Sequence, residues 1–138
     1  MWEGIPEGIE YSHTHTTQMS ADGSKILSSH VMKTKDGAIL STGSGMETWD
    51  AKRNKIFSSH SGYDGGKLYT GPSELIGIGE SAEKWKYTET ISGKTYEVIQ
   101  TRKTEAPNKR SETNVRVKDP DSSTTSTFTR QPKKKTKK

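Results

Sequence analysis

Three histidines are the residues of this sequence best suited to chemistry: His15, His30 and His60. A neutral imidazole can accept a proton, ligate a metal ion or hydrogen-bond a ligand, and its ordinary pKa lies near neutral pH. Three imidazoles are also the protein ligands of some open zinc sites. Glu89 is a candidate acidic partner for acid–base chemistry. The chain has no cysteine, which excludes a thiol nucleophile, a disulfide and a cysteine metal site.

Turn signals recur at short intervals and indicate strands between them. Asp22-Gly23, Asp36-Gly37 and Ser92-Gly93 are typical hairpin turns, because such turns need residues that tolerate positive φ. Helical spacing is not sustained anywhere, and the best helical candidate is a single turn at 81–84. We expect a bend at 71–73 and a polar loop at 105–110. The predicted strands span residues 8–20, 25–35, 38–50, 55–63, 67–70, 74–80, 84–92, 94–103, 111–118 and 124–130.

This pattern predicts an all-β fold in which each hairpin joins strands that are consecutive in sequence. The result is an up-and-down antiparallel meander of about 8–10 strands. We expect it to form a closed or nearly closed lipocalin-like barrel, because closure removes exposed sheet edges. Residues 1–130 form the predicted barrel domain, and the lysine-rich segment 131–138 is predicted to be a disordered tail.

The turn lengths also fix which residues face each other across neighbouring strands. A two-residue turn at Asp22-Gly23 places His15 opposite His30, and the next turn places Gly43 opposite His30. A four-residue loop at 51–54 places Gly45 opposite His60. The face that carries the histidines is the predicted interior. It comprises Ile9, Tyr11, His13, His15, Met19, Ile26, His30, Met32, Ile39, Gly43, Gly45, Trp49, Ile56 and His60.

Polar groups and two glycines share one level of this interior, which predicts a pocket. Glycine in a strand leaves space or allows a close approach, so we expect Gly43→Leu to fill the pocket while the domain stays folded. One alternative is that the buried histidines only hydrogen-bond to serine, threonine, tyrosine or water. The other is a three-histidine metal site. The predicted ligand-pocket residues are Tyr11, His15, His30, Gly43, Gly45, Trp49, His60 and Glu89.

The formal net charge of +5 equals the number of lysines in the last six residues. The barrel is therefore about neutral, and a weak, salt-sensitive affinity for polyanions is expected of the tail alone. Its charges are Lys133, Lys134, Lys135, Lys137 and Lys138. No apolar run is long enough to span a membrane as a helix, and Met1 to Gly4 do not start a signal peptide. With no cysteine to suggest an oxidising compartment, we expect a cytoplasmic protein.

Several short motifs resemble a group of small bacterial calycin-like barrels of unknown function, which occur beside ketosteroid-isomerase-like domains. The motifs are Trp2-Glu3-Gly4, the two Asp-Gly hairpins, Gly43-x-Gly45, Trp49-Asp50, 61–66 and Trp85-Lys86-Tyr87. The resemblance implies a lipocalin-like barrel. Nitrobindin-type haem barrels are more distant relatives of that group and carry Gly-x-Trp-x-Gly, of which this chain has only Trp2 and Gly4. No cofactor is therefore expected.

The sequence thus predicts a non-enzymatic module that encloses a small organic ligand in a polar, histidine-containing interior. One alternative is an enzyme of isomerase or cyclase type that uses a pocket histidine as general base. The other is an interaction protein that works through its basic tail. No catalytic or metal-binding residue is assigned.

Overall fold

The computed structural model describes residue 6 and residues 8–132. Within these residues, all regular secondary structure is β-strand. Asp-Gly and Ser-Gly turns with positive φ at Gly23, Gly37 and Gly93 separate several of the strands, as expected. The strands are β1 (Tyr11–Met19), β2 (Lys25–Thr34), β3 (Ile39–Asp50), β4 (Lys55–Asp64), β5 (Lys67–Ile78), β6 (Ala82–Ile91), β7 (Lys94–Ala106), β8 (Lys109–Arg116) and β9 (Asp119–Thr129).

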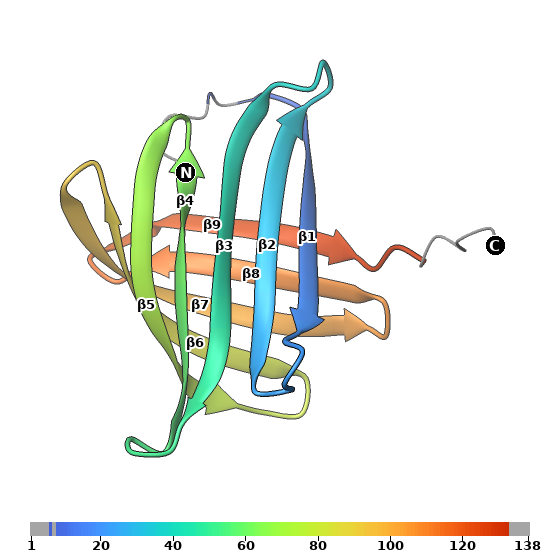
Figure 1. Cartoon of the computed structure of the whole chain (residues 1–138). Coiled ribbons are helices and arrows are strands. Elements are labelled where there is room, and N and C mark those ends of the chain that lie inside the picture. Colours follow the sequence, from blue (N-terminus) through green and yellow to red (C-terminus); the bar gives the residue numbers. More distant parts are fainter. Residues whose placement is uncertain (1–5, 7, 133–138) are drawn as a thin grey trace.

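The strands form one antiparallel meander in the order β1 to β9, which confirms the predicted topology. The sheet curls strongly, through 243°, and remains open, so the protein is a half-barrel where a closed or nearly closed barrel was predicted. In Figure 1, β1–β4 run steeply and β6–β9 cross behind them. The two edge strands, β1 and β9, meet through side chains: the Phe128 ring packs edge-on against the His13 ring at 4.9 Å. Because these strands cross steeply, their backbones cannot form a ladder.

Two predicted strands and a bend are in fact the single strand β5, which continues through Gly71 and Pro72. A Cβ atom at Gly71 would overlap the carbonyl oxygen of Thr88 on β6, so only glycine lets the two strands approach so closely here. The predicted helical turn at 81–84 is also wrong, since β6 begins at Ala82. The predicted loop at 105–110 is a tight hairpin between Ala106 and Lys109.

The predicted registers are confirmed where the histidines lie. His15 pairs with His30, His30 with Gly43, and Gly45 with His60. A bulge between Met32 and Lys33 shifts the pairing of β2 with β3 beside the second turn. The other pairs of these two strands have the predicted register.

The apolar core is small. Its buried hydrophobic side chains are Met32, Tyr69, Trp85, Ile91 and Val98. The ends of the predicted interior face lie outside it: Met19, Ile39 and Trp49 are all more than half exposed. They project from strand ends, where no opposite wall covers them, so the prediction of a fully interior face holds only for the middle of each strand.

No helix among the described residues is long and apolar enough to cross a membrane. The predicted disordered tail falls almost wholly on residues 133–138, which lie outside the described part of the chain.

Candidate functional site

A cavity of about 150 Å³ lies between the two walls of the curled sheet. One wall comes from β1–β4 and the other from β5–β9. Polar and aromatic side chains from both walls face it, including all four histidines. Its lining comprises His13, His15, Ser28, Ser29, His30, Gly43, Ser44, Gly45, Glu47, Ser58, His60, Asp64, Tyr69, Ser73, Trp85, Tyr87, Glu89, Gln100, Arg102, Glu112, Asn114, Ser126 and Phe128.

Six of the eight predicted pocket residues line this cavity, and two do not. His15, His30, His60, Gly43, Gly45 and Glu89 are brought together. Tyr11 and Trp49 are 44% and 56% exposed and do not line it. Both lie near strand ends, beyond the level at which the opposite wall closes over the histidines.

The interior glycines provide close approach, not empty space. A Cβ atom at Gly43 would overlap the Tyr69 hydroxyl and lie 2.8 Å from Cε1 of His30. The expected tolerance of Gly43→Leu is therefore wrong, because Tyr69 already fills the space above this glycine. Gly43 pairs with Gly62, and Gly62 pairs with Tyr69. The two glycines thus allow the sheet to curl until His30 and Tyr69 meet across them, with ring centroids 6.4 Å apart.

His30 takes part in a hydrogen-bonded chain that ends at a buried carboxyl group. Its Nε2 lies 3.0 Å from the Ser41 hydroxyl, which donates to Oδ1 of Asp64 at 2.5 Å. Asp64 is 3% exposed, and burial raises its pKa. Burial, together with the nearby imidazoles of His13, His15 and His60, lowers the pKa of His30 to about 4. At neutral pH His30 is therefore an uncharged imidazole.

His60 is a second neutral imidazole that faces the cavity. Its ring packs against the Tyr69 ring at 5.8 Å and edge-on against the Tyr87 ring at 5.4 Å. No described residue is hydrogen-bonded to its ring nitrogens in the structure. Burial, with a further contribution from Arg102, lowers its pKa. The ring is thus held by aromatic contacts and leaves its donor and acceptor available to a ligand.

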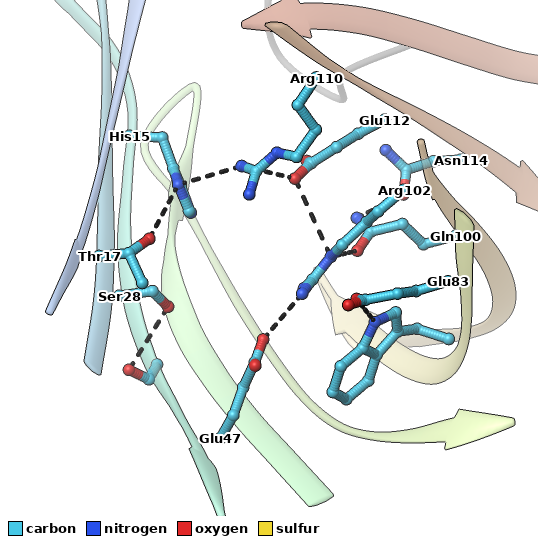
Figure 2. A network of polar contacts seen from close by, with 12 residues as sticks. His15, Thr17, Ser28, Glu47, Glu83, Gln100, Arg102, Arg110, Glu112 and Asn114 are labelled. Carbon is cyan, nitrogen blue, oxygen red and sulfur yellow. Dashed lines mark hydrogen bonds and ion pairs between the residues drawn. The ribbon is translucent and has the colours of Figure 1, made fainter. Parts of the chain in front are cut away.

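A network of charged groups crosses the cavity between its two walls (Figure 2). Nη1 of Arg102 on β7 donates to Oε1 of Glu47 on β3 at 2.8 Å, and its Nε donates to Gln100 at 2.7 Å. The Arg102 guanidinium also lies over the Trp85 ring. Arg110 and Glu112, both on β8, form an ion pair at 2.9 Å. These contacts join β3 to the far wall.

His15 closes the network on β1. Nη2 of Arg110 lies 3.3 Å from Nδ1 of His15 and can only donate to it, so Nδ1 is unprotonated and His15 is neutral (Figure 2). Burial, with Arg110 and Arg102 nearby, lowers the pKa of His15 despite the opposing influence of Glu112. This contact joins β8 to the edge strand β1 where no backbone ladder exists.

A second hollow of about 490 Å³ opens at one end of the half-barrel. We call it the mouth. It is lined by residues of the β5–β6 turn, including Glu80 and Ser81, and by Arg110. His15, Ser28, Glu47 and Arg102 line both the mouth and the cavity. The Glu47–Arg102 ion pair therefore lies where the two hollows meet.

Several groups at this site were not predicted from the sequence. Tyr69, Arg102 and the Ser41–Asp64 pair are the most prominent. The register of the Ser92-Gly93 hairpin could have revealed Arg102, because it shares a strand face with Val98 and Gln100. Within the described residues, no group of three or more histidine, cysteine, aspartate or glutamate side chains is arranged to hold a metal ion.

Fold and site together define a curled all-β protein with a polar, ring-lined interior cavity. No family model, no curated protein and no solved structure matches the chain.

Proposed function

We propose that this protein is a non-enzymatic module that binds a small organic ligand in its interior cavity. The observation that carries the proposal is the cavity itself, because polar groups that could pair with a ligand converge on it from opposite walls. The lipocalin-like character expected from the resemblance is part of the same proposal.

Two features of the site support ligand binding over a purely structural role. A structural interior would satisfy its polar groups internally, since buried polar groups are costly when they are not hydrogen-bonded. Here the His60 ring and the Ser58 hydroxyl face the cavity, and no described residue is hydrogen-bonded to either. The mouth provides the route by which a ligand would reach them.

Replacing Ser58 with leucine is expected to weaken ligand binding at least about ten-fold, because the added carbons would occupy a cavity of only about 150 Å³. Binding of a library of single-ring polar fragments would be followed by saturation-transfer NMR and by the shifts of the His60 ring protons. Folding would be checked by thermal denaturation, which we expect to change little.

Ser59→Leu is the matched control. Ser59 is the next residue of β4 and is exposed, so the same substitution there adds the same carbons outside the cavity. Fragments should bind this variant as they bind the unmodified protein. Equal loss of binding in both variants, or no loss in either, would contradict an interior site.

A second candidate function is favoured by the chain from His30 through Ser41 to Asp64. In an enzyme of isomerase or cyclase type, neutral His30 would take a proton from carbon, and the Ser41–Asp64 pair would stabilise the imidazolium that forms. The Tyr69 hydroxyl, 3.5 Å from Nε2 of His30, also lies beside the reacting base.

Exchange of the α-hydrogens of cyclohexanone in deuterated water tests this candidate directly. The protein should accelerate exchange with a rate that rises through pH of about 4 and then levels off, because the base must be neutral. His30→Gln should reduce the acceleration by about 10²-fold or more. Acceleration that is absent, or unchanged in His30→Gln, argues against the enzyme and leaves the binding module.

A further inference from the structure

The size of the cavity limits the ligand to a single ring. A cavity of about 150 Å³ is comparable to engineered protein cavities that hold one benzene molecule. A fused two-ring system would have to extend past the Glu47–Arg102 ion pair into the mouth.

The walls favour a flat ring with polar substituents. Tyr69, Trp85, Tyr87 and Phe128 line the cavity, and aromatic pairs are stabilised in offset-stacked and edge-on arrangements. The His60 and Tyr87 rings already meet edge-on, at 82°. Between the rings lie hydroxyl and amide groups, including Ser58 and Asn114, that can donate to or accept from ring substituents.

Each arginine and glutamate of the site has a partner of opposite charge, and Glu112 lies near both Arg110 and Arg102. Glu47 is paired with Arg102 at 2.8 Å and Glu112 with Arg110 at 2.9 Å. Oε2 of Glu89 forms a longer ion pair with Nη2 of Arg116, at 4.0 Å. No arginine in these pairs is left over for an anionic ligand, and no glutamate for a cationic one.

The other titratable groups of the lining include four imidazoles and the carboxyl group of Asp64. Burial lowers the pKa of His13, His15, His30 and His60, which favours the uncharged imidazoles. Asp64, the remaining carboxyl group, is 3% exposed and already accepts a hydrogen bond from the Ser41 hydroxyl at 2.5 Å, and burial raises its pKa.

We infer that the cavity takes a neutral, single-ring aromatic molecule that carries both a hydrogen-bond donor and an acceptor. The inference rests on the proposed function and specifies the chemical class of its ligand. A charged ring would leave an unpaired charge between the two walls, where desolvation is costly.

Benzamide, benzoate and benzamidine test the inference because they have nearly the same shape and differ in charge. Affinities would be measured at pH 7 by titration while the His60 ring protons are followed by NMR. Benzamide is expected to bind at least about ten-fold tighter than benzoate or benzamidine. The two-ring analogue 2-naphthamide should bind more weakly than benzamide.

Glu47→Gln tests the role of charge matching. It removes the negative charge that faces Arg102 at 2.8 Å and leaves only Glu112, which lies 3.9 Å from Nε of Arg102 and is already paired with Arg110. The affinity for benzoate should therefore rise relative to benzamide by about ten-fold or more. Glu97→Gln is the matched control. It removes the same charge from the exposed pair with Lys86 on the outer surface, and the ratio of the two affinities should stay constant.

The outcomes separate this inference from the proposed function. Tighter binding of benzoate, benzamidine or 2-naphthamide than of benzamide, with the His60 protons perturbed, would overturn the ligand class and leave a binding cavity. If no probe or fragment of any charge perturbs the His60 protons, both the ligand class and the proposed function fail.

Discussion

Replacing Gly71 with alanine should lower the free energy of unfolding by about 3 kcal/mol, at the upper end of the range for overpacked cores. A Cβ atom at this position would overlap the backbone carbonyl of Thr88 on the neighbouring strand β6. A backbone atom cannot rotate away as a flexible side chain can, so β5 and β6 would have to separate at this position. Urea denaturation followed by Trp fluorescence would measure the change.

Gly77→Ala is the control in the same strand. Its Cβ atom would meet only Cβ of Lys84, at an ordinary contact distance of 3.7 Å. Alanine also restricts the unfolded chain, so this variant should be as stable as the original protein or slightly more stable. Equal effects at the two positions would show that glycine is not needed for close approach at Gly71.

Acidification is expected to produce the second large effect. Because burial lowers the folded-state pKa of His30 from 6.5 to about 4, the unfolded chain binds a proton more readily between these values. The stability that neutral His30 contributes is therefore fully present above pH of about 6.5 and is lost as the pH falls toward 4. One pKa unit corresponds to about 1.4 kcal/mol, so this contribution is at most about 3 kcal/mol, and less after solvent screening.

The other interior groups shape the same pH profile. The lowered pKa values of His13, His15 and His60 act in the same direction as that of His30. Asp64 acts in the opposite direction, because its raised pKa favours proton uptake by the folded state in acid. Urea denaturation at intervals from pH 7.5 to 4 would measure the profile.

His30→Gln should flatten this pH dependence without removing it. Glutamine keeps a hydrogen-bonding group near Ser41 and cannot be protonated in this range. A profile that is flat in the original protein, or unchanged in His30→Gln, would show that the interior histidines are as easily protonated in the folded state as in the unfolded one.

The sequence by itself determined the hairpins and most of the register. A short turn brings adjacent strands together, and its length decides which residues pair. His15 opposite His30 and Gly45 opposite His60 follow from such local rules, and so does the shared interior position of the histidines. Strand continuity through Gly71 and Pro72 could not be predicted locally, because it depends on how closely β6 approaches.

Only the tertiary structure decided what lies opposite the histidines. Arg102 meets Glu47 across 55 residues of sequence, and Arg110 meets His15 across 95. These contacts depend on how far the sheet curls, and glycines on neighbouring strands make room there for Tyr69 and His60. Local turn chemistry specifies pairing within each hairpin and carries no information about total curvature. The sequence therefore predicted the curled meander but not that it would stop at a half-barrel, and the charge-matched walls of the cavity became visible only in the folded chain.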